Sequence, residues 1–558
     1  MKELIVSIID AAIERARAGG QLVSEHPAVG IEAPKDPAHG DAASNVALTI
    51  ARAERKAPKA IAEIIKANVE LPPEVIEVTV AGPGFINFRM APGYWHREMR
   101  RAAAQGEQFW KPQKWELRPG AGDKVQVEFL SANPTGPVTV GHGRNAVLGD
   151  TIARMYEAAG FRLTREYYFN DGGRQMKLLG ESVRVRYLQA HGIAATLPED
   201  GYQGEYIVEI AAALKAEHGD KYVAETELEV FRAVAVKAIF ADINRTCERL
   251  GIRFDVYTNE LDLLNSGAVD AVLAALKDRD LTFEKDGAVW LRGEPLGLPK
   301  DAVLVRSGAE RQPTYRTPDI AYHIEKLKRG FDLIVDVFGA DHIGEHQQVV
   351  AAVKALGYDA TPISAIIYQF VTLTRGGEKV KMSTRKATYV TLDELIDEVG
   401  ADVVRFFFVF RKSDSQLDFD LELAKKQAPE NPVFYVQYAH ARLASVFREA
   451  EKAGLAMPAD ADAIDLGLLD AEELDLAKRA IAFPGLMTAA AQALEPHRIS
   501  FYLLELAGEF HRYYNQASNR IIGPDRELSL ARIFLAQILK AALAGGLKLL
   551  GVSAPDRM

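Results

Sequence analysis

The chain has 558 residues, more than one hydrophobic core usually serves, so we expect three or four domains. Its 48% hydrophobic and 26% charged residues are ordinary for a globular protein. The 67 Lys and Arg residues against 77 Asp and Glu residues give a net charge of −10, which excludes a protein that coats nucleic acid non-specifically but allows RNA binding through a local basic face.

The N-terminus and the cysteine content indicate a cytoplasmic protein. Glu3 lies inside a helical pattern where a signal peptide has a long apolar core, and no apolar run approaches the length of a membrane span. We therefore expect no membrane partner. The single cysteine, Cys247, excludes an internal disulfide and argues against a structural zinc site, so a buried small residue is its expected role.

The first part of the chain has the pattern of a small α+β domain. Apolar residues share one helical face over residues 2–18, and residues 44–66 have a second helical pattern. An alternating run at 75–80, a Gly-Pro turn and a second run at 85–88 predict two strands. We place the end of this domain near residue 115.

From residue 124 onward, strands alternate with helices. Residues 124–130 form a candidate buried strand, followed by a Pro/Gly loop and a helix from about 143 to 159. Further strand candidates, at 333–338 and 363–372, are each followed by a helix. This alternation predicts a Rossmann-type, doubly wound parallel sheet.

Two long helical regions complete the predicted organisation. Residues 175–300 are mostly helical and polar, which indicates a helical insertion within a catalytic domain spanning 116–430. Residues 431–558 show helices only and predict an all-α helical bundle. The expected fold class is multidomain α/β, with a small α+β domain at residues 1–115.

The helix after the first strand begins at a glycine-rich turn that contains His142. Gly141 and Gly143 allow backbone N–H groups to approach a phosphate, and the helix N-terminus adds positive potential. His142 can donate a hydrogen bond to a phosphate oxygen as charge builds during displacement. A Gly-x-Gly turn by itself is equally consistent with a simple tight turn.

A second cationic segment, residues 381–386, follows a strand and the Gly376-Gly377 turn, which predicts a loop. Cations on such a loop can close over a triphosphate and stabilise charge as pyrophosphate leaves. A solvated basic loop is the usual explanation for an isolated cluster of this kind. Within the cluster, Lys381 and Arg385 are the strongest candidates.

Together, these two segments resemble the signatures of arginyl-tRNA synthetases, which are class I aminoacyl-tRNA synthetases. Residues 131–137, continuing into Val-Gly-His-Gly-Arg at 140–144, are similar to the first signature, and residues 381–386 to the second. The chain departs from them at Thr139, where the first signature has a histidine, and at Thr384, where the second has a lysine. Three cations are candidates to replace that lysine: Arg385, Lys386 and Lys124.

Recognition of arginine needs carboxylates, because a planar guanidinium is best bound by bidentate acceptors. Glu128 ends the first strand, and Asp319 lies four residues after Tyr315, although an acid after Pro318 also suits a helix cap. The resemblance implies that Glu128 and Asp319 hold the guanidinium and that Tyr315 packs on the substrate stem. The implied arginine-binding residues are Glu128, Asn133, His142, Tyr315, Asp319 and Asp341.

The resemblance also implies the ATP site and the residues of catalysis. The strand at 333–338 leads to Gly339 against the ribose and to Asp341 against the substrate ammonium. The implied ATP-binding residues are Thr139, Gly141, His142, Gly339, Lys381 and Met382. The implied catalytic residues are His142, Lys381, Ser383 and Arg385. We expect Mg²⁺ to arrive with ATP and no dedicated metal site, because His342 and His346 lack a third ligand.

Contacts with tRNA are expected from both ends of the chain. Residues 81–88 resemble the N-terminal domain of the family, where an exposed Phe beside an amide suits RNA reading. Residues 431–442 resemble the start of its anticodon-binding domain, and 510–515 offer aromatic rings and a base that we expect to be exposed. The expected RNA contacts are Phe85, Asn87, Tyr513 and Asn515.

The implied activity is ATP-dependent activation of L-arginine and its transfer to tRNA(Arg), with activation dependent on bound tRNA and a monomeric protein. Two other readings remain open. One is a small-molecule nucleotidyltransferase or ligase that shares the Gly-His turn. The other is a non-catalytic RNA-binding protein derived from a synthetase, which the departures at Thr139 and Thr384 keep open. A different class I synthetase is a weaker alternative, because the identity of the amino acid depends on Glu128, Tyr315 and Asp319.

Overall fold

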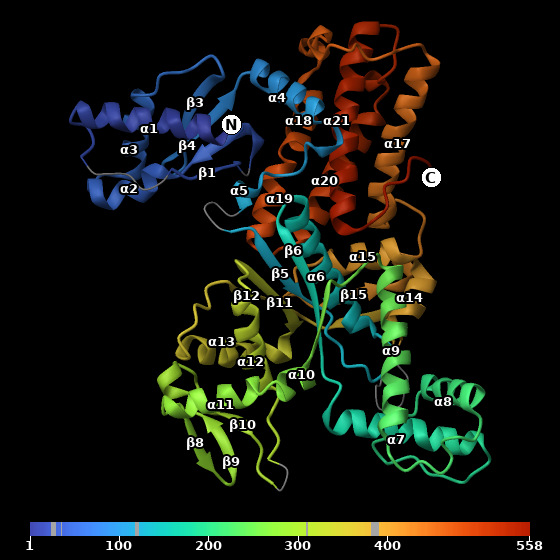
Figure 1. Cartoon of the computed structure of the whole chain (residues 1–558). Coiled ribbons are helices and arrows are strands. Elements are labelled where there is room, and N and C mark those ends of the chain that lie inside the picture. Colours follow the sequence, from blue (N-terminus) through green and yellow to red (C-terminus); the bar gives the residue numbers. More distant parts are fainter. Residues whose placement is uncertain (24–28, 35, 118–121, 309–310, 381–389) are drawn as a thin grey trace. The chain divides into compact units, whose positions relative to one another are not determined.

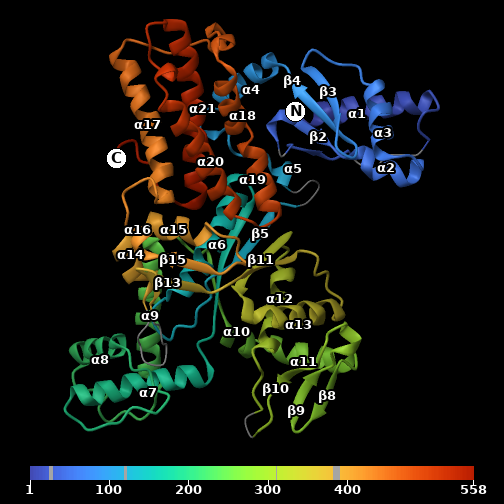
Figure 2. The ribbon, with the colours of Figure 1, turned by 180° about the vertical axis from the view of Figure 1, so that it is seen from behind.

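The computed structural model describes residues 1–558 except 24–28, 35, 118–121, 309–310 and 381–389. The described chain divides into two compact units, which Figures 1 and 2 show from opposite sides. The first unit comprises Met1–Glu107, Val446–Ile481 and Tyr513–Leu539. The second comprises Gln108–Ser445, Ala482–Arg512 and Lys540–Met558.

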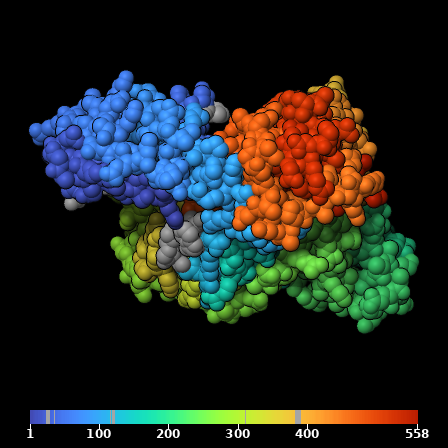
Figure 3. All heavy atoms as spheres, turned by 90° about the horizontal axis from the view of Figure 1, so that it is seen from above, coloured from blue at the N-terminus to red at the C-terminus, as the bar shows by residue number. Residues whose placement is uncertain are grey.

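The first unit contains an antiparallel sheet in the order β1-β2-β4-β3, with the N-terminal helices packed on it. The apolar face predicted for the first helix is buried and includes Ile5, Ile9 and Ile13. In the space-filling view the N-terminal segment, in blue, forms one continuous body (Figure 3). The elements are α1 (Lys2–Ala18), β1 (Ile31–Glu32), β2 (Ala42–Ser44), α2 (Val46–Glu54), α3 (Pro58–Ala67), β3 (Val75–Ala81), β4 (Phe85–Met90) and α4 (Pro92–Gln105), together with α18 (Ala471–Ile481), which packs on α4.

A five-stranded parallel sheet, in the order β12-β11-β5-β6-β7, forms the centre of the second unit. The order reverses beside β5, so a ligand crevice is expected where the carboxyl ends of β5 and β11 meet. The strands are β5 (Lys124–Glu128), β6 (Arg162–Phe169), β7 (Val256–Asn259), β11 (Leu333–Gly339) and β12 (Ile363–Tyr368).

Helix α6 (Val140–Ala158) connects β5 to β6 and is buried along almost its whole length. Its close approach to the sheet requires a residue without a side chain, since an added Cβ at Gly149 would lie 2.2 Å from the Cβ of Phe129. Helices α12 (Arg316–Lys328) and α13 (Ile343–Ala355) precede and follow β11. The predicted Rossmann-type alternation of strands and helices is confirmed.

The segment expected to be a helical insertion also contains strands. Helices α7 (Gly173–Ala190), α8 (Glu205–His218) and α9 (Glu229–Arg249) agree with the expectation, as do α10 (Glu260–Asn265) and α11 (Ala268–Asp278). However, β7 is an edge strand of the parallel sheet. In addition, β8 (Thr282–Lys285) and β9 (Ala288–Leu291) form a separate antiparallel sheet with β10 (Ala302–Val305).

All residues from 431 to 558 are described, and every regular element among them is helical, as predicted. The α-helices of this region are α17 (Pro432–Lys452), α18, α19 (Phe483–Gln492), α20 (His497–Tyr514) and α21 (Arg526–Leu550).

The other α-helices and strands of the described chain lie before residue 431. They are α5 (Lys114–Leu117), β13 (Val371–Arg375), β14 (Glu378–Lys379), α14 (Leu392–Val399), α15 (Ala401–Val409), β15 (Leu417–Asp420) and α16 (Leu421–Ala424).

Helix α21 contradicts one expectation from the sequence, and Cys247 confirms another. Helix α21 is long and apolar enough to cross a bilayer, contrary to the expectation that no run approaches that length. In the structure 72% of its most apolar window is buried inside the protein, as is usual for a core helix of a bundle. Cys247 is buried as predicted, and burial, with smaller contributions from nearby acids, raises the pKa of its thiol to about 12.

Candidate active site

The loop after β5 has a strained backbone at the carboxyl edge of the sheet. Leu130 and Ser131 have φ angles of 67° and 43°, in the left-handed region that residues with side chains rarely adopt. Asn145 of α6 holds this turn: its Oδ1 accepts a hydrogen bond from the Leu130 N–H at 2.5 Å, and its Nδ2 donates to the Val337 carbonyl at 2.7 Å. One side chain thus joins the ends of β5 and β11.

At the N-terminus of α6, Thr139 and His142 form a reciprocal pair. The Thr139 N–H donates to His142 Nδ1 at 3.3 Å, and the Thr139 hydroxyl lies 3.2 Å from the same nitrogen. Burial lowers the pKa of His142, so the ring is neutral at pH 7. Because Nδ1 accepts a hydrogen bond, the proton is on Nε2. The helix start therefore offers a neutral N–H donor. The contact that selects this tautomer comes from the backbone N–H of residue 139, so it is kept when that residue is a threonine.

Three acidic residues lie side by side across the middle of the parallel sheet. The strand register pairs Asp336 of β11 with Glu128 of β5, and Glu128 with Glu166 of β6. Neighbouring strands are about 4.8 Å apart, so three adjacent carboxylates would repel one another without counter-charges. We call these three residues the acid row.

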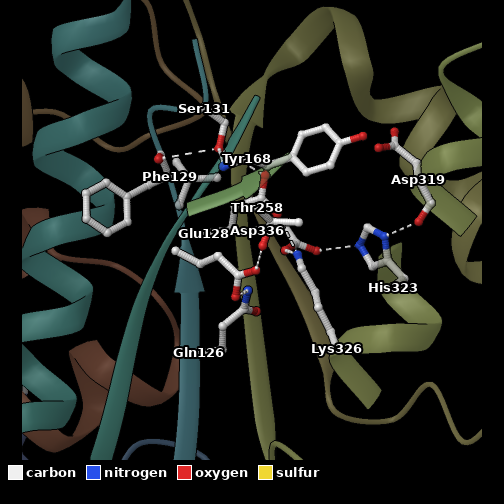
Figure 4. A network of polar contacts seen from close by, with 12 residues as sticks. Gln126, Glu128, Phe129, Ser131, Tyr168, Thr258, Asp319, His323, Lys326 and Asp336 are labelled. Atoms are coloured by element: carbon white, nitrogen blue, oxygen red, sulfur yellow. Dashed lines mark hydrogen bonds and ion pairs between the residues drawn. The ribbon is translucent and has the colours of Figure 1, made fainter. Parts of the chain in front are cut away.

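Lys326 of α12 is fully buried beside the acid row. Its Nζ lies 2.5 Å from Glu128 Oε2 and 2.6 Å from Asp336 Oδ1, and it sits 4.2 Å from the ring centre of Tyr322. Burial alone would lower the pKa of Lys326, but Asp336 and Glu128 outweigh burial and raise it above its usual value. The ammonium is therefore charged, and it bridges two of the three acids (Figure 4).

His323 lies one turn earlier on α12 and extends this network. Its Nε2 lies 2.9 Å from Asp336 Oδ2, and its Nδ1 lies 2.8 Å from the carbonyl oxygen of Asp319. Both ring nitrogens therefore face oxygen atoms, one of the Asp336 carboxylate and one of the backbone. The hydrogen bonds run continuously from Glu128 through Lys326, Asp336 and His323 to the backbone of Asp319 (Figure 4).

A second group of carboxylates surrounds Tyr168, near the carboxyl end of β6. Glu260, the first residue of α10, accepts hydrogen bonds from the Tyr168 hydroxyl at 2.8 Å and from Asn170 Nδ2 at 2.5 Å. Tyr168 stacks on Tyr322 with ring centres 4.6 Å apart. In Figure 4 the Tyr168 hydroxyl points toward Asp319. Asp319 is close enough to both Glu128 and Glu260 to be repelled by their carboxylates. We call this group of three carboxylates the three-acid pocket.

The charge of the three-acid pocket is not balanced. Burial, followed by repulsion from Glu128 and Glu260, raises the pKa of Asp319 well above its usual value. Burial also raises the pKa of Glu260. Lys326 contacts Glu128 but makes no ion pair with Asp319 or Glu260 in the described part of the chain. A bound cation would relieve this repulsion, so the pocket suits a cationic ligand.

The structure brings Glu128 and Asp319 together, as predicted from the sequence, and adds Glu260 to them. Glu260 was missed because its segment was expected to be a helical insertion, with no strand ending there. Glu260 directly follows β7, so it could have been identified as an acid at the carboxyl edge of the parallel sheet, where ligands bind. Lys326 and Asp336 were missed because their partners lie on other elements.

The other predicted arginine-binding residues lie around this edge. Tyr315 is half exposed at the start of α12, one turn before Asp319, and its hydroxyl donates to Glu345. Asn133 Oδ1 accepts from the Asn170 N–H at 3.0 Å, which fixes the loop after β5 against the end of β6. Asp341 lies just beyond Gly339, where β11 ends.

Lys124, one of the candidates to replace the signature lysine, is at the opposite end of the sheet. It begins β5, whereas Glu128 ends it, and four residues of strand span about 13 Å. Lys124 therefore lies far from the carboxyl edge of the sheet, where ligands are expected to bind. The structure argues against Lys124 as the replacement for the signature lysine. The predictions on Lys381, Met382, Ser383, Arg385 and Lys386 fall outside the described residues.

Three groups with metal-binding chemistry lie together beneath the pocket. Ligand atoms of His323, Asp336 and His346 lie within 4.8 Å of one another, so the acid near His346 comes from β11 and not from the segment around His342. The ammonium of Lys326 already contacts Asp336, and His323 meets it at hydrogen-bond distance. These contacts are those of a hydrogen-bonded ion network.

The predicted RNA contacts differ in exposure. Phe85 is exposed, while Phe88 of the same strand is in the core. Asn87 is 3% exposed, because it lies in β4 between β2 and β3. Tyr513 was expected to be exposed, and this is wrong: it is 1% exposed, and its hydroxyl donates to Glu473 at 2.7 Å. Phe510 is likewise buried, and Asn515 is exposed.

Models of known families match nearly the whole chain. The arginyl-tRNA synthetase N-terminal domain matches residues 3–90, and the catalytic domain of class I (R) tRNA synthetases matches residues 111–407. The DALR anticodon-binding domain matches residues 436–558. The three matches follow the order predicted from the sequence.

Individual proteins are similar over their full length. The chain is 48% identical to the arginine–tRNA ligase of Desulfotalea psychrophila over 529 residues, which covers 95% of this chain and 94% of that protein. It is 49% identical to that of Salinibacter ruber over 548 residues, covering 95% of each. The structure of the Thermus thermophilus arginyl-tRNA synthetase has the same fold, with a TM-score of 0.75, 24% identity and complete coverage of both chains.

The reversed parallel sheet, with His142 at the start of the helix after its first strand, defines the catalytic domain of a class I aminoacyl-tRNA synthetase. The three-acid pocket, to which the end of β5 contributes Glu128, carries an excess of carboxylates, as a ligand with a cationic side chain requires. With relatives at 48% and 49% identity over almost the entire chain, the chain belongs to the arginyl-tRNA synthetase family.

Proposed function

We propose that this chain activates L-arginine with ATP and transfers it to the 3′-terminal adenosine of tRNA(Arg). In the first step, the arginine carboxylate attacks the α-phosphorus of ATP, the bond to the bridging oxygen breaks, and pyrophosphate leaves. In the second, a ribose hydroxyl of the tRNA attacks the adenylate carbonyl and releases AMP. The observation that carries the proposal is the unbalanced three-acid pocket, which includes Glu128 at the end of β5, while His142 begins the helix that follows this strand.

In this proposal Glu128, Asp319 and Glu260 bind the guanidinium. A guanidinium offers five N–H donors in one plane, so several carboxylates can each receive a directed hydrogen bond. Tyr315 packs on the aliphatic stem. Asn133 and Asp341 bind the α-amino and carboxylate end of the substrate. A ligand without the cation leaves buried carboxylates unpaired, which gives strong selection without an editing domain.

His142 acts on ATP in this proposal. Its Nε2–H is the donor that meets the phosphate where negative charge develops, and Thr139 and Gly141 supply the backbone at the helix N-terminus. Gly339 approaches the ribose. Lys381 and Met382 contact ATP, and Lys381, Ser383 and Arg385 stabilise the departing pyrophosphate. Mg²⁺ accompanies ATP and neutralises phosphate charge, and the chain needs no zinc.

We assign the domains as residues 1–115 for tRNA contact, 116–430 for catalysis and 431–558 for anticodon binding. Phe85 supports the first assignment, because an exposed ring can stack on a base. Asn515 remains a proposed contact, while Asn87 and Tyr513 would need to become exposed before they could touch RNA. We further propose a cytoplasmic monomer whose arginine activation depends on bound tRNA.

The proposal is tested by charging a tRNA(Arg) transcript with radiolabelled amino acids. We expect arginine to be attached, and lysine and citrulline to be rejected, since citrulline has the shape of arginine without its charge. Equal charging with citrulline would contradict a pocket selected for a cation. Tight tRNA binding without charging would favour a non-catalytic RNA-binding protein instead.

Replacing Glu260 by glutamine should raise the KM for arginine by about tenfold, because one charged hydrogen-bond partner of the guanidinium becomes neutral. The glutamine oxygen can accept from Asn170 Nδ2, and its N–H₂ can donate to the Tyr168 hydroxyl oxygen, so the fold around it should remain intact. Steady-state kinetics with arginine and ATP varied in turn will check this. A KM for arginine that stays at the wild-type value would remove Glu260 from the pocket.

Arginine binding should strengthen as the pH rises. Burial and repulsion raise the pKa of Asp319 in the empty pocket, so part of the population carries a proton there below that pKa. Only the ionised form pairs with the guanidinium, so the KM for arginine should fall as the pH rises through the raised pKa. The KM for ATP measured over the same range is the control. An Asp319→Asn variant should lose the dependence.

A further inference from the structure

We propose that Lys326 is a positioning residue for arginine recognition: it fixes the Glu128 carboxylate and, through α12, sets the separation between Glu128 and Asp319. The inference rests on the proposed function, in which these two acids hold the guanidinium. Lys326 is fully buried beneath the pocket, so it acts through Glu128 rather than on the substrate.

One face of helix α12 matches the acid row. Helix α12 presents His323, Lys326 and Arg329 at three-residue intervals, which places them on one side of the helix. They meet the row in strand order. His323 contacts Asp336, Lys326 contacts Asp336 and Glu128, and Arg329 contacts Glu166 at 2.8 Å. We call these three residues the basic ladder of α12.

The basic ladder fixes α12 against the sheet both in rotation and along the helix axis. A shift of α12 by one residue would rotate the ladder by about 100° and separate every base from its acid. Asp319 belongs to the same helix, one turn before His323, and its carbonyl oxygen receives the Nδ1 contact of that ring. The contacts that fix the helix therefore also place Asp319 relative to Glu128.

The Glu128 carboxylate is held by a partner at each of its two oxygens. Lys326 Nζ binds Oε2 at 2.5 Å, and the Ser131 hydroxyl donates to Oε1 at 3.0 Å. Each oxygen thus has one partner from the protein and can accept from a ligand as well. The ammonium of Lys326 lies beside this carboxylate, while Asp336 and Glu166 lie on either side of Glu128 in the sheet. The substrate therefore meets an acceptor that is held in one position by two partners.

The test compares Lys326→Met with Lys328→Met, a control two residues further along α12. Lys328 is exposed and pairs only with Glu325 in the described part of the chain. We expect Lys326→Met to raise the KM for arginine by about 10- to 100-fold, since an acid misplaced by about 1 Å loses that much. The KM for ATP should stay within about twofold of wild type. Equal increases in both KM values would indicate general damage to the domain and overturn the inference.

A conservative variant separates positioning from a loss of stability alone. Lys326→Arg keeps a charged donor beside Glu128 and should recover most of the affinity for arginine that Lys326→Met loses. A Lys326→Arg enzyme that folds with wild-type thermal stability but has a KM for arginine as high as that of Lys326→Met would contradict the proposal.

A double-mutant cycle with Glu128→Gln identifies the route of the effect. If Lys326 acts through Glu128, adding Lys326→Met to Glu128→Gln should change the KM for arginine by less than about threefold, well below the effect of Lys326→Met alone. If Glu128→Gln leaves that KM unchanged, the proposed pocket is wrong. If Glu128→Gln raises it and Lys326→Met does not, only the positioning role is wrong. Should Lys326→Met fail to fold, the charge-balanced Lys326→Met/Asp336→Asn pair takes its place, with the same expected rise in the KM for arginine.

Discussion

Replacing Asp319 by asparagine is expected to lower kcat/KM for arginine by on the order of 10²- to 10³-fold, equivalent to about 3–4 kcal/mol. Asparagine keeps the shape of the side chain but removes the charge that pairs with the guanidinium. Its amide N–H₂ also introduces a donor facing a ligand that has only donors. The loss should appear mainly in the KM for arginine, measured by steady-state kinetics at saturating ATP.

The same substitution should not weaken the fold. Burial and the neighbouring carboxylates of Glu128 and Glu260 raise the pKa of Asp319, so its charged form opposes folding at neutral pH. Removing that charge should leave the thermal unfolding midpoint unchanged or slightly higher. Glu325→Gln, on the same helix and paired with Lys328, is the matched control with wild-type kinetics. A lower midpoint for Asp319→Asn would show that this acid serves the fold rather than the ligand.

Replacing His142 by asparagine should lower kcat by about 10²- to 10³-fold with little change in the KM for arginine. Asparagine can still accept from the Thr139 N–H as Nδ1 does, but it has no donor at the position of Nε2. Single-turnover formation of the adenylate is the appropriate measurement, because product release does not obscure it.

Glutamine at position 142 provides the comparison. Its longer amide can place an N–H near Nε2, so His142→Gln should retain more activity than His142→Asn. A neutral donor is sufficient in this account, because burial lowers the pKa of His142 and keeps the ring uncharged at pH 7. Equal activity of the two variants would contradict a role for the Nε2 donor.

The sequence indicated most of the fold because its patterns are local. The apolar face of α1, the two short runs on either side of a Gly-Pro turn that form β3 and β4, and the loop from β5 into α6 each depend on neighbouring residues. Strand β7 escaped prediction because it has four residues and lies between longer helical patterns. The burial of Tyr513 escaped for a related reason: its partner, Glu473, lies forty residues earlier in the chain.

The site was only partly predictable because its electrostatics depend on strand register. Glu128 and Asp319 could be found from their segments. The pairing of Asp336, Glu128 and Glu166 across three strands cannot be found in this way, since each acid belongs to a different part of the chain. Once this register is known, each residue of the basic ladder can be paired with an acid of the acid row, although in sequence α12 resembles an ordinary charged helix.

The most direct test of the account is arginine-dependent exchange of pyrophosphate into ATP, run with and without tRNA(Arg). Lysine and citrulline serve as amino-acid controls. The account predicts exchange with arginine alone, dependent on tRNA, and its loss in Asp319→Asn. An absence of exchange with every amino acid, from folded protein that still binds tRNA, would contradict it and indicate that Thr139 and Thr384 mark an inactive site.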